Sequence, residues 1–297
     1  MAEVNNNKLL IQRIGLVAIT QFLVGFSSLI LLPVLTKNMS IQDYGIWAQI
    51  TVTIGIIPQV VMFGLPFTMV RHLPPIKSKR GIQELFYSFL VIILFATILT
   101  VIVLYLFATE IAYILFDNNI LVVKILAIVL LFECMNLFFT NYLRASKQIK
   151  KHSLNLFIKI VLRIVLVSLF VLSGYGIAGA AIGLLLSSVI VTLVVAYDIL
   201  SEIGIYRPRF ENMKEYLSFG IPTIPGNLSS WVVNSSDRYV IGLFLGTAAV
   251  GYYNPGYSLG NIIGVFVAPF SFMLPVVLSE HYDNNNIEEV KKILSYS

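Results

Sequence analysis

Residues 31–50 read LLPVLTKNMSIQDYGIWAQI, and residues 240–259 repeat the same pattern as VIGLFLGTAAVGYYNPGYSL. In each copy, a long apolar helix is expected to end in a short polar turn. A glycine with an aromatic neighbour (Gly45 and Trp47; Gly251 and Tyr253) then begins a second apolar helix. Two repeated lobes that rock about a shared central site give alternating access, so polytopic chains with repeats are typical of transporters. The repeat therefore predicts an all-α polytopic membrane protein with a two-lobe repeat transporter fold.

Composition supports the membrane assignment. The chain is 58% hydrophobic and only 12% charged, with a mean hydropathy of +0.87. Such a chain cannot cover itself with a water-facing surface, and its apolar runs are near the ~20 residues that a bilayer crossing needs. The formal charge of +5 does not indicate nucleic acid, because most of the basic residues lie in the loops between apolar runs and form no continuous patch. The lipid bilayer is thus the expected surrounding, and nucleic acid is excluded as a partner.

Hydropathy predicts eight membrane-spanning helices. Their expected ranges are 14–35, 44–70, 85–107, 120–142, 154–172, 177–197, 217–245 and 251–278. The repeat pairs the first two helices with the last two, and residues 287–297 resemble the start of a ninth helix. We therefore expect a first lobe of six helices over residues 1–210, and the start of a second lobe over residues 211–297. On this interpretation the chain is truncated after its eighth helix.

Loop charges predict the orientation. One set of loops, together with both chain ends, holds every loop lysine and arginine except Lys37. Basic loops stay in the cytoplasm, so the N-terminus is expected there, in a multi-pass protein of the plasma membrane. The opposite loops are expected to be short, with the longest at residues 108–119.

Three segments together resemble a known family. They are LLPVLTKNMSIQDYGIWAQ (31–49), YLRASKQIKKHS (142–153) with GYGIAGAAIG (174–183), and SSDRYVIGLFLGTAAVGYYNPGYSLG (235–260). In order and spacing they are similar to the polysaccharide flippases of the multidrug/oligosaccharidyl-lipid/polysaccharide exporter superfamily. The resemblance implies a carrier of twelve to fourteen helices around a central cavity. It also implies transport of undecaprenyl- or dolichyl-linked oligosaccharides to the outer leaflet, with glycan-assembly membrane proteins as partners.

Polar stripes on the seventh and eighth helices are the first candidate cavity. A lipid-linked sugar carries a pyrophosphate and many hydroxyls, so its carrier needs hydrogen-bonding groups and positive charge between helices. On each helix the candidate side chains share one face. The alternative is that small polar residues only hold helices together. The stripes comprise Asn227, Ser230, Asn234 and Arg238 on the seventh helix, and Asn254, Tyr257, Ser258 and Asn261 on the eighth.

A second basic stripe lies on the fifth helix. Lys159 and Arg163 are spaced by four, so they share a face. Glu133 on the fourth helix falls at the same membrane depth as Arg163, where a lone charge costs roughly 3 kcal/mol or more, so the two are expected to pair. The alternative roles are a structural ion pair for Glu133 and Arg163, and snorkelling for Lys159. Lys124 is a further basic candidate on the fourth helix, on the side opposite Glu133 and nearer the external end. Asp237 on the seventh helix is a candidate for charge balance or ion coupling.

The sequence contains no strong motif for catalysis or for metal binding. The three histidines have no partner at zinc-ligand spacing, and neither a Gly-x-Ser-x-Gly elbow nor a Gly-Lys-Ser/Thr phosphate loop occurs. We therefore expect no metal, no cofactor and no catalytic residue, and a transporter instead of an enzyme. Two alternatives remain, a cation-coupled drug or metabolite exporter of the same superfamily and a membrane polymerase or ligase for lipid-linked sugars. The basic candidates favour the flippase over the cation-coupled exporter.

Overall fold

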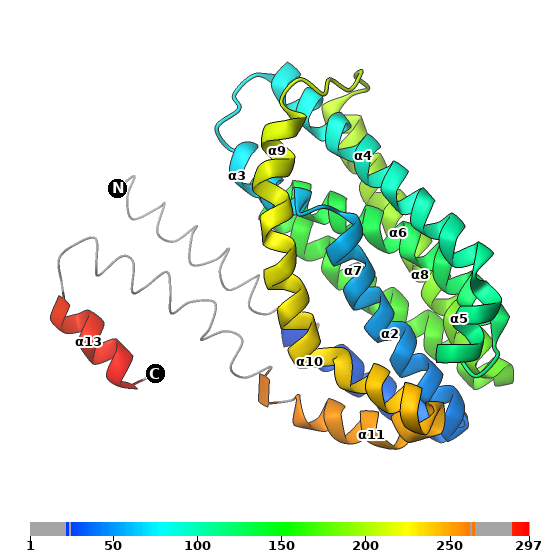
Figure 1. The fold of residues 1–297 in the computed structure, drawn as a ribbon. Helices are drawn as coiled ribbons and strands as arrows, with labels where there is room; N and C mark the ends of the chain where they lie inside the picture. Colours follow the sequence, from blue (N-terminus) through cyan, green and yellow to red (C-terminus); the bar gives the residue numbers. More distant parts are fainter. Residues whose placement is uncertain (1–21, 24, 262, 265–286, 297) are drawn as a thin grey trace.

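The computed structural model describes residues 22–23, 25–261, 263–264 and 287–296, and the described chain is helical with no strand (Figure 1). The start of the predicted first span and the end of the eighth span lie outside these residues. Residues 25–38 form a helix ahead of the numbered elements. The elements that follow are α2 (Ile41–Val61), α3 (Leu65–His72), α4 (Lys79–Leu106), α5 (Ala108–Leu115), α6 (Ile120–Ala145), α7 (Ile149–Phe170), η1 (Val171–Tyr175), α8 (Gly176–Ile203), α9 (Met213–Gly220), η2 (Ile221–Thr223), α10 (Ile224–Leu245), α11 (Thr247–Gly260) and α13 (Ile287–Tyr296).

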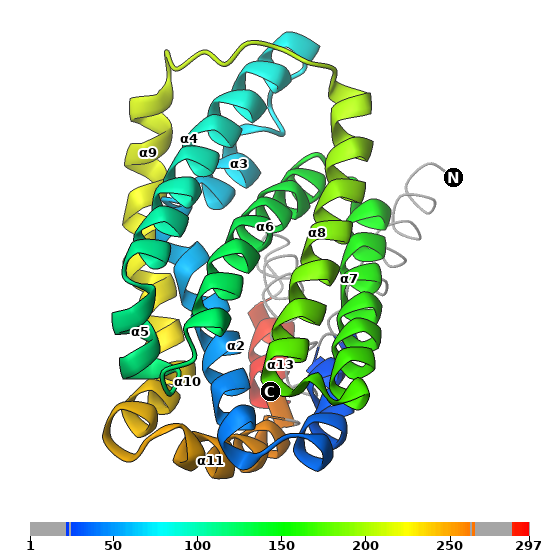
Figure 2. The same ribbon diagram turned by 90° about the vertical axis from the view of Figure 1, so that its right-hand side faces the viewer.

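The long helices form a bundle with α6 at its centre. Helix α6 packs against α8 and α4, α7 packs against α8, and α2 packs against α10 and α11 (Figures 1 and 2). Four helical stretches of the described chain are long and apolar enough to cross a membrane, namely Ile41–Val61, Lys79–Leu106, Ile120–Ala145 and Ile149–Ile203. The last is a hairpin of two helices, because Gly174 and Gly176 have positive φ angles of 86° and 55° at the turn. The chain is therefore a multi-pass membrane protein.

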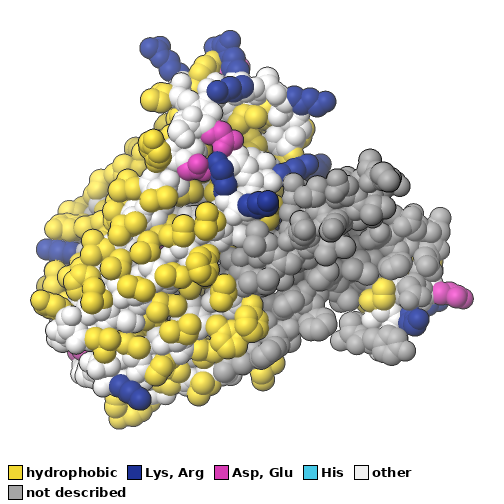
Figure 3. Space-filling view, turned by 180° about the vertical axis from the view of Figure 1, so that it is seen from behind, with side chains coloured by type: hydrophobic (Ala, Val, Ile, Leu, Met, Phe, Trp, Pro, Cys, Tyr) yellow, Lys and Arg dark blue, Asp and Glu magenta, His cyan; other side chains and the backbone are white. Residues whose placement is uncertain are grey.

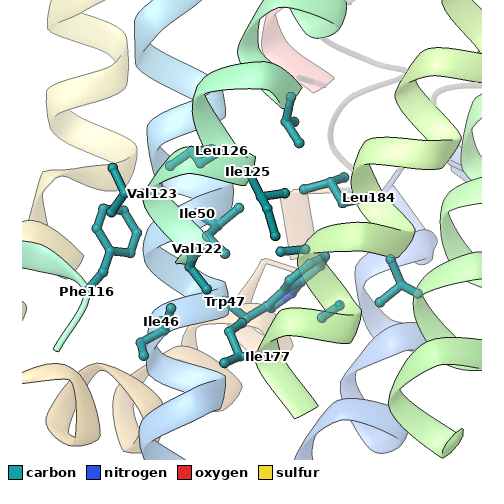
Figure 4. Close-up of a cluster of buried hydrophobic side chains, with 14 of the residues drawn as sticks. Ile46, Trp47, Ile50, Phe116, Val122, Val123, Ile125, Leu126, Ile177 and Leu184 are labelled. Atoms are coloured by element: carbon teal, nitrogen blue, oxygen red, sulfur yellow. The ribbon is translucent and has the colours of Figure 1, made fainter. Parts of the chain in front are cut away.

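Two apolar clusters fill the bundle, while its outer faces are apolar as well. In one cluster the Trp47 side chain lies among Ile50, Ile177 and Leu184, which come from α2 and α8 (Figure 4). On the outside, hydrophobic side chains are spread over the part of the face that is not drawn in grey, and basic ones gather mainly at its upper end (Figure 3). Leu106, for example, is 73% exposed. An apolar exterior suits lipid contact. We call the end with the basic loops, residues 73–78, 146–148 and 204–212, the basic end.

Three of the predicted segments differ from the structure. The span 44–70 is two helices, because Phe63 and Gly64 adopt positive φ angles between α2 and α3. The span 217–245 is α9, η2 and α10, with Pro222 in the 3-10 turn and Pro225 at the start of α10. The loop expected at 108–119 was wrong, since α5 occupies residues 108–115. Its sequence, ATEIAYIL, is separated from the long apolar run of α4 by Phe107 alone, which hid the separate helix.

Helices α2 and α11 cross at the end opposite the basic end, and the crossing uses the repeated glycines. A Cβ atom added at Gly45 would lie 1.8 Å from the carbonyl oxygen of Thr247. In the reciprocal contact, a Cβ atom added at Gly251 would lie 2.0 Å from the carbonyl oxygen of Ile41. Neither position has room for a side chain, so the two backbones approach as closely as glycine permits. The glycines that the sequence repeats thus form one two-fold-like contact.

We expect Gly45→Ala to destabilise the protein by about 1–3 kcal/mol, because its methyl group would push against the α11 backbone, which cannot rotate away as a side chain can. Gly256→Ala is the matched control on α11, since a Cβ atom there meets no atom within 4 Å. That control should be neutral or stabilising by up to ~1 kcal/mol, the helix preference of alanine over glycine. Thermal unfolding of the purified protein checks both, and equal midpoints for the two variants would contradict the close crossing.

Candidate functional site

Arg238 lies buried between α10 and α11, close to the α2–α11 crossing. Its side chain is on the inner face of α10, and the residue is only 7% exposed. The guanidinium carbon lies 3.8 Å from the ring centroid of Tyr257, which is a cation–π contact. The guanidinium Nε has no hydrogen-bond partner, and no carboxylate of the described residues forms an ion pair with Arg238. A buried guanidinium without a counter-charge is a natural place for an anion.

Asp237, although adjacent in sequence, does not pair with the guanidinium. One of its carboxylate oxygens accepts a hydrogen bond from the backbone N–H of Arg238 at 2.9 Å. The other accepts one from the hydroxyl of Tyr253 at 2.5 Å. Asp237 therefore holds α10 and α11 together and leaves the charge of Arg238 unbalanced.

Hydrogen bonds fix the aromatic side chains around Arg238. Asn254 donates to the hydroxyl of Tyr44 at 2.9 Å, which joins α11 to α2. Tyr257 donates to the backbone carbonyl of Asn234 at 2.5 Å, so its ring is held beneath the guanidinium. Tyr44 is itself buried and directly precedes Gly45 of the crossing. This arginine site is therefore positioned by α10 together with α2 and α11, the two helices that cross at that end.

The structure does not gather the whole α10 stripe at one place. Ser230 and Asn234 are exposed, and their side chains donate to carbonyls of their own helix, as is common for small polar residues in helices. Asn261 is exposed at the end of α11. Asn227 lies at the other end of α10, in a separate cavity. The reason is that the stripe extends over three turns, and only its last turn meets α11.

That cavity opens near the basic end, between α2, α3, α6 and the segment from α9 to α10. It has a volume of about 490 Å³ and a mostly apolar lining that includes Met62, Phe67 and Phe219. Its polar lining consists of Arg71, Arg144, Asn141, Asn227, Gln59 and Thr223. Neither arginine forms an ion pair with a described residue, and no acidic side chain lines the cavity. The cavity thus offers positive charge and amides beside an apolar wall.

The sequence interpretation did not bring these residues together in one cavity, although Asn227 was one of its cavity candidates. It expected Arg71 to be a topology anchor first and a cavity residue second, and it placed Arg144 on the same face of the fourth helix as Glu133. The break at Phe63 and Gly64 redirects α3, so that Arg71 turns towards α6. An arginine at the end of each of two helices was the available signal, but topology alone explains such arginines equally well.

Glu133, Lys159 and Arg163 form a buried ion cluster between α6, α7 and α8. Lys159 Nζ lies 2.6 Å from Glu133 Oε2, and Arg163 Nη2 lies 3.1 Å from Glu133 Oε1. Ser188 of α8 donates to Glu133 Oε1 at 2.7 Å, and Lys159 also donates to Asn136 Oδ1 at 3.0 Å. The expected contact between Glu133 and Arg163 is therefore present, and Lys159 joins it instead of snorkelling away.

Lys124 does not join this cluster. Its ammonium lies 4.9 Å from the ring centroid of Tyr105 on α4, in a cation–π contact on another side of α6. This follows from the helical period, because Lys124 and Glu133 are nine residues apart and therefore point in different directions. The described residues also contain no group of three His, Cys, Asp or Glu side chains that could hold a metal ion.

Comparisons with known proteins agree with this architecture. The sequence matches the family described as "Polysaccharide biosynthesis protein" over residues 10–279. Among solved structures, it is similar to a MATE protein in complex with MaL6, with a TM-score of 0.69, 18% identity and coverage of 96% of this chain and 68% of that chain. A comparison with curated proteins finds no match.

Two further structures have the same fold. One is the inward-facing conformation of a multidrug resistance MATE family transporter of the MOP superfamily, with a TM-score of 0.67, 19% identity and coverage of 94% of this chain and 65% of that chain. The other is a MOP superfamily transporter from Pyrococcus furiosus with a binding pocket of reverse polarity. Its TM-score is 0.66 at 19% identity, with coverage of 96% of this chain and 67% of that chain. The chain spans about two thirds of these structures.

Proposed function

Because the chain belongs to the polysaccharide biosynthesis protein family and has the fold of MATE transporters, we propose that it flips a lipid-linked oligosaccharide across the plasma membrane. In this proposal the substrate enters from the cytoplasmic leaflet and leaves to the outer leaflet by alternating access. Residues 1–210 would form the first lobe, and residues 211–297 the start of the second. The proposed role is transport for cell-surface polysaccharide biosynthesis, and not catalysis.

The cavity at the basic end is the observation that supports this substrate. A lipid-linked oligosaccharide presents a diphosphate between an apolar tail and a hydroxyl-rich sugar. Arg71 and Arg144 offer unpaired guanidinium groups for phosphate oxygens, and Asn141 and Asn227 offer amides for hydroxyls. The apolar remainder of the wall suits the isoprenyl segment nearest the diphosphate. Arg238, near the opposite end, would receive the same diphosphate after the lobes rock.

A cation-coupled exporter receives less support from the same contacts. Such a protein would be expected to carry a carboxylate that is free to bind the cation. Glu133 is instead compensated by both Lys159 and Arg163, and Asp237 is occupied by Tyr253 and a backbone N–H. Neither carboxylate is available, so an anionic substrate fits this chain better than a cationic one.

Reconstitution in vesicles tests the proposed activity. We expect the full chain to move a fluorescent isoprenyl-diphosphate disaccharide between leaflets, measured as loss of protection from an impermeant quencher. The double variant Arg71→Gln/Arg144→Gln should lower the rate by about tenfold or more, because two charge-assisted hydrogen bonds to phosphate are lost. Arg80→Gln is the matched control, since Arg80 lies at the same end but outside the cavity. Equal rates for both variants would remove the cavity from the transport path.

The proposed orientation has its own test. In a Cys134→Ser background, cysteines at Asn38 and Asn118 should react with an impermeant thiol reagent added to intact cells, whereas those at Ser78 and Asn212 should not. All four positions are exposed in the structure, so differences in labelling report the side of the membrane. The basic loops next to Ser78 and Asn212 are the reason for placing these two in the cytoplasm. Labelling at Ser78 and Asn212 but not at Asn38 and Asn118 would show that the chain has the opposite orientation.

A further inference from the structure

The ion cluster on α6, α7 and α8 has more positive than negative charge. It contains one carboxylate, Glu133, and two cations, Lys159 and Arg163. No second carboxylate of the described residues contacts either cation. Glu133 is 6% exposed, and the side chains of Lys159 and Arg163 are 19% and 29% exposed. One positive charge thus remains uncompensated inside a helix bundle, where it is costly.

The cluster also has two hydrogen-bond donors to spare. Asn136 is 1% exposed, and its Nδ2 has no hydrogen-bond partner, while its Oδ1 is taken by Lys159. The Nε of Arg163 is buried without a partner, while its Nη2 binds Glu133. The unpartnered atoms are both donors, and the nearest acceptors of the cluster, the carboxylate oxygens of Glu133, are already bonded to Lys159, Arg163 and Ser188. Buried donors are rarely left unsatisfied, so an acceptor is missing.

We propose that this cluster binds a small inorganic anion of the halide class, with Arg163, Lys159 and Asn136 as its ligands. A single anion removes the excess charge and accepts from the free donors. The size of the ligand follows from burial, because Asn136 and Glu133 are nearly inaccessible, which leaves no room for an oligosaccharide. The site lies within α6, α7 and α8, apart from the cavity that holds Arg71 and Arg144. It is independent of the proposed flipping of lipid-linked sugars.

The test is binding of radioactive chloride to the purified full chain in nanodiscs, with sodium gluconate keeping the ionic strength constant. We expect one saturable site. Arg163→Gln should weaken it by about tenfold or more, because the uncompensated charge and a donor are lost together. Arg163→Lys should keep most of the affinity. Lys124→Gln is the matched control, a half-buried cation on α6 that contacts Tyr105 instead, and it should bind chloride as the unaltered protein does.

A second variant keeps the proposal testable where Arg163→Gln fails to fold. Asn136→Leu retains all three charges and removes only the free amide, so it should also weaken chloride binding. The absence of saturable binding, or unaltered affinity in the two variants, would overturn the site. Displacement of chloride by a short-chain isoprenyl diphosphate would assign the cluster to the substrate headgroup and overturn the halide. Because chloride binding is measured without transport, its outcome is separate from that of the flipping experiment.

Discussion

Arg238→Ala should abolish export of the surface glycan while the amount of protein in the membrane stays near normal. The guanidinium is buried and stacked on Tyr257, and it forms no ion pair with a carboxylate of the described residues. Its removal therefore leaves no buried carboxylate without a counter-charge. Its role in the proposal is to hold a diphosphate, for which a planar group with paired donors is well suited. An alanine would leave the anion uncompensated in a low-dielectric site. Arg238→Lys should retain part of the activity, because the charge remains without the paired donors.

Complementation of a flippase-null strain by the full-length protein, with membrane levels measured in parallel, checks this expectation. Arg80→Ala is the matched control, because Arg80 is an exposed arginine paired with Glu84 and should leave export intact. Full export by Arg238→Ala would remove this residue from the site. Loss of the protein together with export would instead assign Arg238 to the stability of the bundle.

Glu133→Ala should lower the free energy of unfolding by about 3–5 kcal/mol, the largest loss of stability that we expect from one substitution here. Removal of the carboxylate leaves the partly buried Lys159 and Arg163 without a counter-charge and takes away the acceptor of the Ser188 hydroxyl. Thermal or denaturant unfolding of the purified protein measures the effect. Asp198→Ala is the matched control, because the pair of Asp198 with Lys151 is exposed and its loss should change stability little.

The triple variant Glu133→Leu/Lys159→Met/Arg163→Leu distinguishes the loss of one charge from the replacement of the whole ion cluster by apolar side chains. Replacing a buried ion network by apolar side chains of similar size is often neutral or stabilising, so this variant should recover most of the loss. It should also lose any chloride binding. A Glu133→Ala protein that unfolds at the unaltered temperature would show that the cluster contributes no net stability.

The contact between Glu133 and Arg163 could be predicted from the sequence, because both residues fall at the same depth in the membrane. Their depth was counted from the loops on either side of each helix. Because a buried charge of either sign needs an opposite charge beside it, an ion pair was expected. The structure adds Lys159 and Ser188, because the packing of α7 and α8 against α6 decides which neighbours reach the carboxylate. Lys124 was expected on the opposite side of the same helix from Glu133, and its contact with Tyr105 of α4 agrees with that direction.

By itself, the sequence determined that the protein is helical and spans the membrane several times, since apolar run length, composition and the placement of loop charges are properties of the chain that hold before any packing. It also determined that Gly45 and Gly251 occupy corresponding positions in the two copies of the repeated segment. Only the tertiary structure decided that Gly45 and Gly251 meet in one crossing, that Arg238 is buried without a counter-ion, and that Arg71 and Arg144 share a cavity. These facts depend on helix breaks and crossing angles, which arise from contacts between residues far apart in sequence.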